Sequence, residues 1–158
     1  QLGYQSESGT WRNAYLTAAR ELRYGSLRIP ASMGRQIAHA ITIDQLFDMI
    51  GVRFNPEKFN HGPSRINWHF SDLGEDHVLG IQRSTIHHDP NTSDDKAEAA
   101  VTTTRKVISQ ILGGQKSLNE VLEEGDFDIL GNQLVVKAFF DSLESFITAP
   151  LIEPNSNE

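Results

Sequence analysis

The sequence has no cysteine, no long apolar run, and fewer basic than acidic residues. The absence of cysteine excludes disulfide bonds, thiol catalysis and cysteine-ligated zinc, and it leaves the redox compartment open. No segment approaches the roughly 20 apolar residues that a membrane-spanning helix needs. The formal net charge is −7, from 14 Lys and Arg against 21 Asp and Glu. This charge argues against nucleic acid and anionic membranes as partners, because both are bound largely through basic patches.

The first residues carry no signal-peptide pattern, and the chain begins with Gln rather than Met. We interpret this start as that of a fragment or a processed product. The localisation is unknown at this stage, since a chain without cysteine fits the cytoplasm and the periplasm equally well. A length of 158 residues is that of one domain with at most a short appendage.

The N-terminal part predicts one amphipathic helix outside the main domain. In SGTWRNAYLTAARELRYG, apolar residues that include Trp11, Tyr15 and Leu22 recur on one face at helical spacing. We expect this face to pack either on something outside the compact domain or in a surface groove of that domain. The predicted segments are a helical end of a separate domain (1–25), a linker (26–40), the main domain (41–150) and a flexible tail (151–158).

The main domain opens with a helix and a β-hairpin. The helix begins at Thr42, where the sequence has the spacing of a capping box. In RINWHFSDLGEDHVLGIQ, apolar and polar residues alternate on both sides of DLGE, a pattern that is typical of two antiparallel strands joined by a tight turn. A turn at DLGE would place Phe70 opposite His77 and Trp68 opposite Leu79.

The remaining patterns complete the sheet and its cover. Strands at Ser84–His88 and in AAVTTT would extend the hairpin into a meander of four strands, and DFDILG supplies a short fifth strand. Helical patterns recur in RKVISQILGG, SLNEVLEEG and NQLVVKAFFDSLESF. Together they predict an α+β fold, with a mainly antiparallel five-stranded sheet covered on one face by helices and preceded by an isolated N-terminal helix.

The adjacent histidines His87 and His88 are the first candidates for a metal site, and their spacing argues against one. Neighbouring residues on a strand point to opposite faces, so the two imidazoles cannot converge on one ion. His69 and His77 fall on opposite faces of the hairpin for the same reason. We therefore predict surface or half-buried strand histidines and no metal-binding residue.

Other catalytic patterns are missing from the sequence. No Gly-rich loop stands between a strand and a helix in the manner of a phosphate-binding loop, and GxSxG does not occur. The carboxylate pairs Asp94–Asp95 and Glu123–Glu124 lie where loops or helix ends are expected, and solvation is their ordinary role. From the residues alone we predict no catalytic and no cofactor-binding residue.

Large apolar side chains are the more informative feature. Six of them come from the first core helix, the sheet and the last helix and are candidates for contact with an apolar ligand: Phe47, Trp68, Phe70, Phe139, Phe140 and Phe146. Because Phe139 and Phe140 are adjacent, they diverge by about 100° on a helix, and one of them could line a groove. A packed core is the simpler interpretation, and a ligand tunnel between sheet and helices is the alternative.

Four stretches in order along the chain resemble the C-terminal domain of the alkyl sulfatases of the metallo-β-lactamase superfamily: TIDQLFDMIGVRFN, INWHFSDLGEDHVLGI, TTTRKVISQILGG and LEEGDFDILGN. The N-terminal LGYQSESGTWRNAYLTAARELRYG resembles the end of the helical dimerisation domain that precedes it in these enzymes. The resemblance covers nearly the whole chain. It implies the sterol carrier protein fold and a homodimeric parent enzyme to which the isolated helix contributes.

The resemblance implies an activity for a longer enzyme rather than for these residues. Family members hydrolyse alkyl sulfate esters such as dodecyl sulfate and bind two zinc ions through a His-x-His-x-Asp-His motif in an N-terminal catalytic domain. IHHDP in this chain does not match that motif, so no catalytic or zinc-binding residue is carried over. Zinc is expected in the catalytic domain of the parent enzyme. Because family members are often exported, a periplasmic or secreted location fits the resemblance.

Three functions follow as alternatives. In the first, the chain is the non-catalytic C-terminal part of a zinc-dependent alkyl sulfatase, with the catalytic metallo-β-lactamase-like domain and an alkyl-chain substrate or lipid as its partners. In the second, it is an independent sterol-carrier-like lipid-binding module, for which an isolated N-terminal helix has no use. In the third, the domain has no cavity and only packs against its neighbours. The acidic net charge favours contact with an alkyl chain over contact with a sulfate head.

Overall fold

The computed structural model describes residues 1–25, 27–28, 41–144 and 148–149. The chain divides into two compact units, one of residues 1–33 and 146–158 and one of residues 34–145. Most of the predicted linker and all of the predicted tail lie outside the described residues, so the expectations for these two segments stay predictions.

The described part of the first unit contains two helices and one short strand pair. The helices are α1 (Leu2–Gln5) and α2 (Gly9–Tyr24). The strands β1 (Leu27–Arg28) and β7 (Thr148–Ala149) pair antiparallel. The helix predicted for the N-terminal part of the chain is therefore confirmed as α2.

The apolar face of α2 is largely exposed within its own unit. Trp11 is 62% exposed and Leu22 is 77% exposed, although the Trp11 and Tyr15 rings contact each other at a centroid distance of 5.9 Å. The short α1 packs on this helix. Gly3 of α1 lies so close to Leu16 of α2 that a Cβ added to Gly3 would stand 2.9 Å from the Leu16 Cδ2. What covers the exposed part of the face stays a prediction.

The first described helix of the second unit is α4 (Ile43–Arg53), which is capped as the sequence predicts. The Thr42 hydroxyl accepts a hydrogen bond from the Gln45 backbone N–H at 3.2 Å, and the Gln45 side chain accepts one from the Thr42 N–H at 3.0 Å. This capping box satisfies two N–H groups that the start of a helix otherwise leaves without a partner. The helix buries one apolar stripe, which consists of Ile43, Leu46, Phe47 and Ile50.

A five-stranded sheet forms the base of the second unit. Its strands in chain order are β2 (Ser64–Phe70), β3 (Glu75–Gln82), β4 (Thr85–Pro90), β5 (Ala99–Thr103) and β6 (Asp128–Gly131). In space they lie in the order β4-β3-β2-β5-β6. Three neighbouring pairs are antiparallel, and β2 and β5 are parallel. The predicted mainly antiparallel sheet is confirmed, and it is mixed rather than purely antiparallel.

The hairpin of β2 and β3 forms in a register two residues away from the predicted one. Trp68 lies opposite His77, so the expected pairing of Trp68 with Leu79 is wrong. The turn uses residues 71–74, where the Gly74 N–H donates to the Phe70 carbonyl at 2.8 Å and Gly74 adopts a φ of 67°. A shift of two residues keeps every side chain on its predicted face, because side chains alternate with a period of two.

The expected meander of four strands is wrong at its fourth strand. β5 does not add to the edge at β4 but lies beside β2, with Ile66 opposite Ala99. The connecting residues 91–98 are attached to the sheet by Asn67, whose side chain donates to the Asp94 carbonyl and accepts from the Asp94 N–H, both at 3.0 Å. Alternation along a strand indicates its buried face but not its neighbour, which is why the sequence pattern missed this crossover.

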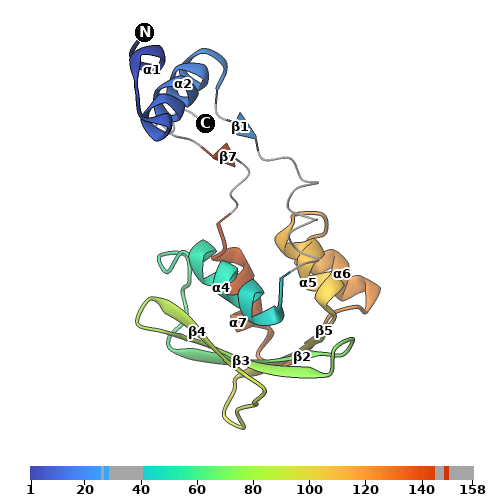
Figure 1. The fold of residues 1–158 in the computed structure, drawn as a ribbon. Helices are drawn as coiled ribbons and strands as arrows, with labels where there is room; N and C mark the ends of the chain where they lie inside the picture. The colour runs from blue at the N-terminus through green and yellow to red at the C-terminus, as the bar shows by residue number, and fades with distance from the viewer. Residues whose placement is uncertain (26, 29–40, 145–147, 150–158) are drawn as a thin grey trace. The chain divides into compact units, whose positions relative to one another are not determined.

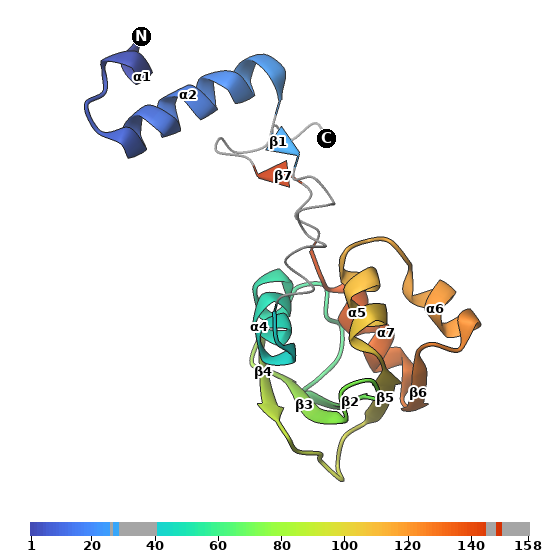
Figure 2. The same ribbon diagram turned by 45° about the vertical axis from the view of Figure 1, so that its right-hand side comes forward.

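Three more helices join α4 over the sheet: α5 (Arg105–Leu112), α6 (Leu118–Glu124) and α7 (Gln133–Asp141). Figures 1 and 2 show α4, α5 and α7 on one side of the sheet, as predicted, and no described helix of this unit on the other side. Ser117 and Glu120 form a capping box at the start of α6, and Gly125 ends this helix with a φ of 77°. In the part of the chain that the structure describes, no helix has the length and apolar character needed to cross a membrane.

Candidate functional site

Aromatic side chains from the first core helix, the sheet and the last helix meet between the sheet and its cover. Five of the six predicted apolar contact residues are brought together there: Phe47, Trp68, Phe70, Phe139 and Phe140. Phe47 packs edge-on against Trp68 at a centroid distance of 5.8 Å. Trp68 in turn lies 6.1 Å from both Phe139 and Phe140. The sixth candidate, Phe146, lies outside the described residues.

Phe127 completes this group, and the sequence analysis did not single it out. Its ring lies 6.1 Å from Trp68 and 5.9 Å from Phe140, and its side chain is 1% exposed. The available signal was its position between two aspartates in DFDILG, at the start of the predicted strand. We refer to the following six residues as the aromatic cluster: Phe47, Trp68, Phe70, Phe127, Phe139 and Phe140.

Phe140 differs from the other members of the aromatic cluster in its burial. Phe139 is fully buried, whereas Phe140 is only half-buried, and the two rings meet at a centroid distance of 5.2 Å. The divergence of these neighbours on the helix was expected from the sequence. Whether Phe140 lines a groove that accepts a ligand stays a prediction.

The aromatic cluster contains one polar atom without a partner. The indole Nε1 of Trp68 is buried and forms no hydrogen bond in the described part of the chain. Leaving a buried N–H without an acceptor costs about 1–3 kcal/mol. An oxygen atom that reached this N–H would therefore be bound favourably.

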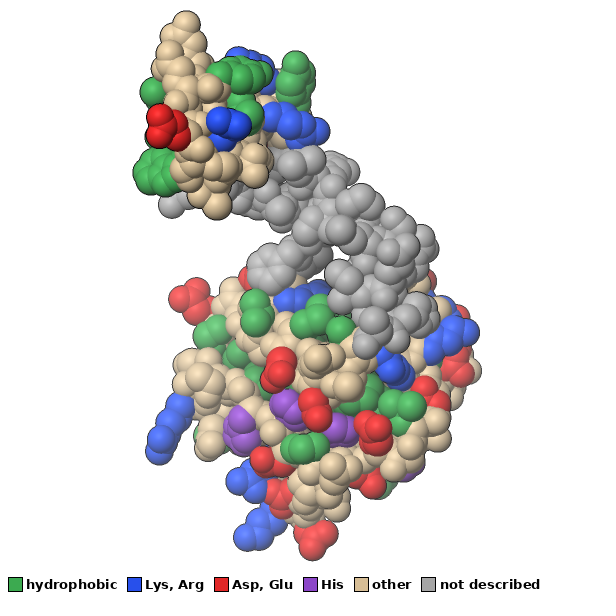
Figure 3. Space-filling model, in the orientation of Figure 1, with side chains coloured by type: hydrophobic (Ala, Val, Ile, Leu, Met, Phe, Trp, Pro, Cys, Tyr) green, Lys and Arg blue, Asp and Glu red, His purple; other side chains and the backbone are tan. Residues whose placement is uncertain are grey.

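Two histidines border the aromatic cluster on the covered face. The rings of His77 and His88 each lie 5.5 Å from the Phe47 ring. The Asp44 carboxylate on α4 lies between them, with its Oδ1 3.7 Å from His77 Nδ1 and 3.3 Å from His88 Nε2. In the view of Figure 3, histidine side chains lie next to acidic ones on the surface of this unit. These contacts hold the first turn of α4 against β3 and β4.

The other two strand histidines face the opposite side of the sheet. His87 lies against Gly80, so the opposite orientation predicted for His87 and His88 is confirmed. His69 contacts Asp76, with 2.7 Å between Nδ1 and Oδ1. Among the described residues, no group of three or more His, Cys, Asp or Glu side chains could hold a metal ion. The described residues thus offer no site for the zinc that the family resemblance implies.

The acidic pair Asp94–Asp95 lies in the crossover before β5. Asp94 accepts a hydrogen bond from the Lys96 backbone N–H at 2.8 Å and forms an ion pair with Arg65. These two contacts, the first being the stronger, hold the pKa of Asp94 below its usual range. A carboxylate that stays ionised and bonded on both sides fastens the loop to the sheet and is poorly suited to donate a proton.

The acidic pair Glu123–Glu124 lies at the end of α6. Glu124 forms an ion pair with Lys116, and this hydrogen-bonded contact raises the pKa of Lys116 above its usual range. The contact joins the loop before α6 to the last turn of the same helix. Its chemistry is that of a surface ion pair, which contributes little to stability.

In the described part of this domain, four helices lie over one face of a mixed five-stranded sheet, and this arrangement defines its class, a sterol carrier protein 2 (SCP2)-like α+β fold. A solved structure described as "UbiJ-SCP2 Ubiquinone synthesis protein" matches it with a TM-score of 0.50. The match covers 68% of this chain and 93% of that chain at 12% sequence identity. At this low identity the likeness shows the fold alone.

Sequence similarity then identifies the family. Residues 31–149 match the alkyl sulfatase C-terminal family, and the chain belongs to this family. It is 30% identical to the (R)-specific secondary-alkylsulfatase of Pseudomonas sp. over 146 residues, which are 92% of this chain and 22% of that protein. The solved structure of the stereoselective inverting sec-alkylsulfatase Pisa1 from Pseudomonas sp. matches with a TM-score of 0.73 at 31% identity, over 92% of this chain and 23% of that chain.

The matches cover nearly all of this chain but only a small part of each relative. The chain spans less than a quarter of the length of either alkylsulfatase, although nearly all of the chain is matched. The resemblance inferred from the four sequence stretches is therefore confirmed. The chain corresponds to the C-terminal region of such proteins.

Proposed function

We propose that this chain is the non-catalytic C-terminal part of a zinc-dependent alkyl sulfatase, and that it assists in binding the apolar tail of the substrate and in assembling the enzyme. One observation carries the proposal: nearly all of the chain matches the (R)-specific secondary-alkylsulfatase, yet it accounts for only 22% of that protein. Most residues of such an enzyme then lie outside this chain, in a partner domain of the metallo-β-lactamase type.

In this proposal zinc belongs to the partner domain. It would supply the activation of the water that attacks the sulfate ester. Two of the ionisable groups that were candidates for chemistry make structural contacts instead: Asp94 holds the crossover to Arg65, and His88 lies beside Asp44 on α4. The contribution of this chain is binding and packing.

The aromatic cluster supports a role in binding an alkyl chain. Each CH₂ group that moves from water into an apolar environment contributes about 0.8 kcal/mol, so a short section of a dodecyl chain suffices for measurable binding. Phe140 is the half-buried member, so it can move aside without opening the fully buried centre. The Trp68 Nε1–H that has no acceptor would donate to an ester oxygen or to a water that accompanies the tail.

The exposed face of α2 supports a role in assembly. A helix that leaves Trp11, Tyr15 and Leu22 exposed on one face presents an apolar surface of the kind that marks an interface. We assign the equivalent helix of a second copy as its occupant, which makes the parent enzyme a homodimer.

An independent lipid-binding module is the second candidate function. The SCP2-like fold favours it, since a sheet with helices on one face can enclose a lipid between the two layers. The α2 helix argues against it, because a carrier that works alone has no use for an exposed apolar helix.

Native mass spectrometry of the purified 158-residue chain with dodecyl sulfate, below its critical micelle concentration, tests tail binding. We expect bound alkyl sulfate on the wild-type chain, fewer bound molecules per chain in Phe140→Asp, and unchanged binding in the control Leu134→Asp, since Leu134 lies on the same helix and is 69% exposed. If Phe140→Asp fails to fold, Phe140→Trp replaces it in this test, because tryptophan fills space without adding charge. Absence of binding to the wild type, or equal binding by all variants, would refute the role of the aromatic cluster.

The same spectra report the oligomeric state. We expect dimers of the wild-type chain and a shift to monomers in Leu22→Ser, because the substitution removes apolar area from the α2 face. A monomeric wild type at all concentrations would contradict the assembly role.

A further inference from the structure

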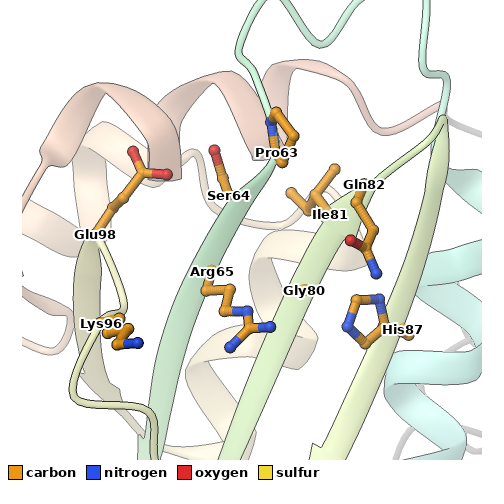
Figure 4. A pocket seen from close by; sticks show the side chains of 9 residues that line it. All are labelled: Pro63, Ser64, Arg65, Gly80, Ile81, Gln82, His87, Lys96 and Glu98. Atoms are coloured by element: carbon orange, nitrogen blue, oxygen red, sulfur yellow. The ribbon is translucent and has the colours of Figure 1, made fainter.

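The face of the sheet without a described helix carries a pocket of its own. Its volume is about 370 Å³, and it lies over β2, β3 and β4 and against the residues that precede β5. Figure 4 shows polar side chains from all four segments around the bare backbone of Gly80. The residues that line it include Arg65, Gln82, His87, Lys96 and Glu98.

Gly80 and His87 form the floor and one wall of this pocket. They lie opposite each other on β3 and β4, and a Cβ on Gly80 would stand 2.2 Å from His87 Nε2 and 2.3 Å from its Cε1. The imidazole therefore occupies the space that any side chain at position 80 would need. Among the described residues, neither the His87 ring nor the Gln82 side-chain amide forms a hydrogen bond. Both groups are thus open to an occupant.

Arg65 is oriented across the pocket by a contact outside it. Its Nη1 donates to Asp94 Oδ2, and Asp94 is itself fixed by the Lys96 backbone N–H. A guanidinium has five N–H donors, of which this contact engages one. Figure 4 shows the guanidinium extending over Gly80 towards His87, so its remaining donors are presented to the space between the two side chains.

The polar groups around Gly80 are mainly donors and cations. Lys96, Arg65 and His87 form a row across the sheet, although the whole chain has a net charge of −7. The one acidic side chain of the pocket, Glu98, points away from this row in Figure 4. A guanidinium fork beside an ammonium, an imidazole and an amide matches an oxyanion, because planar or tetrahedral oxygens accept several N–H groups at once.

We propose that this pocket binds one oxyanion, a sulfate or a carboxylate group, between Arg65, His87 and Gln82, with Lys96 adding positive charge. The site lies on the opposite face of the sheet from the aromatic cluster, so it is independent of the proposed alkyl-chain binding. The oxyanion comes either from a free inorganic anion or from the charged head of an amphiphile, and the recognition chemistry is the same for both.

Nuclear magnetic resonance titration of the isotope-labelled 158-residue chain tests the site. The ligands are sodium sulfate, sodium acetate and hexyl sulfate, at an ionic strength held constant with sodium chloride because exposed charges are screened by salt. We expect saturable shifts at Gly80, Gln82 and His87. Tighter binding of hexyl sulfate than of sulfate would assign the site to an amphiphile head group, and equal binding would assign it to the free anion.

Three variants test the donors separately. Arg65→Gln should weaken binding by at least about tenfold, the effect of losing one good hydrogen bond to a charged group. Gly80→Ala keeps every charge but displaces the His87 ring, and it should also weaken binding. The matched control Lys137→Gln removes one positive charge from the exposed face of α7 and should leave binding unchanged.

The proposal is overturned if none of the three ligands gives saturable shifts at these residues. It is also overturned if Arg65→Gln and Lys137→Gln bind alike. If Arg65→Gln fails to fold because its Asp94 contact is lost, Gly80→Ala decides: unchanged affinity in that variant refutes the site, and weakened affinity supports it.

Discussion

Gly80→Ala places a methyl group where the His87 ring lies. The added Cβ would stand 2.2 Å from Nε2 and 2.3 Å from Cε1, whereas non-bonded heavy atoms keep about 3.5 Å apart. The ring must therefore withdraw by more than about 1 Å. Because the His87 side chain is exposed, it can rotate towards solvent, and the expected loss in the free energy of unfolding is about 1–2 kcal/mol, in the lower part of the range for overpacking.

The same substitution in a His87→Ala background separates the clash from other effects of the methyl group. With the ring absent, Gly80→Ala should be neutral or stabilise by about 0.5 kcal/mol, because alanine restricts the unfolded chain more than glycine does. The coupling energy between the two sites should then be about 1–2 kcal/mol. Gly51→Ala in α4, where an added Cβ meets nothing within 4 Å, is the control and should stabilise by roughly 0.5–1 kcal/mol.

Urea unfolding followed by tryptophan fluorescence measures these free energies. A Trp11→Phe background leaves Trp68 as the single reporter, since the chain has two tryptophans and Trp68 is the one buried in the second unit. If Gly80→Ala costs the same with and without His87, the imidazole does not occupy the space above Gly80. That result would refute both the packing argument and the wall of the pocket.

Three further predictions concern stability. Phe139→Ala should lower the free energy of unfolding by about 3–5 kcal/mol, whereas Leu134→Ala on the same helix should stay within about 0.5 kcal/mol; similar losses in urea unfolding would contradict the burial of Phe139. Arg53 donates to two backbone carbonyls at 2.7 and 2.8 Å, so Arg53→Met should cost about 1.5–3 kcal/mol in the same assay. The pKa of Asp94 is lowered in the folded state by the hydrogen bond from the Lys96 N–H and by Arg65. The ionised carboxylate therefore stabilises the fold above its unfolded pKa of about 4. This contribution is lost as the pH falls from that value through the lower pKa of the folded state. The stability difference between wild type and Asp94→Asn should therefore shrink on acidification, and a growing difference would show that the sign is wrong.

Local sequence patterns predicted the elements of this fold better than their pairing. The α4 cap and the buried faces of the hairpin follow from short-range spacing, and both are as expected. The register of the hairpin depends on which four residues make the turn, and the positive φ of Gly74 favours residues 71–74 over the DLGE turn that we expected. The partner of β5 depends on a crossover whose attachment by Asn67 has no signature in the alternation of β5 itself.

The aromatic cluster and the pocket at Gly80 also differ in how far local sequence patterns predict them. The aromatic cluster could be predicted because large apolar side chains at buried positions of three elements meet in the core, and only Phe127 was overlooked. The pocket at Gly80 and His87 could not be predicted from the sequence. It requires Gly80 to lie opposite His87, and it requires the crossover to bring Asp94 to Arg65. Both conditions depend on strand pairing between distant segments, and the spacing of His87 and His88 predicts only surface or half-buried histidines.

The central claim is that this chain completes an alkyl sulfatase without performing its chemistry. Its most direct test is sulfate release from a secondary alkyl sulfate by a chimera, in which this chain replaces the matched region of the (R)-specific secondary-alkylsulfatase. We predict that the chimera hydrolyses the ester, that the same protein with the region deleted has lost most of this activity, and that the 158-residue chain alone releases no sulfate. Sulfate release by the chain alone, or full activity of the deleted protein, would contradict the claim.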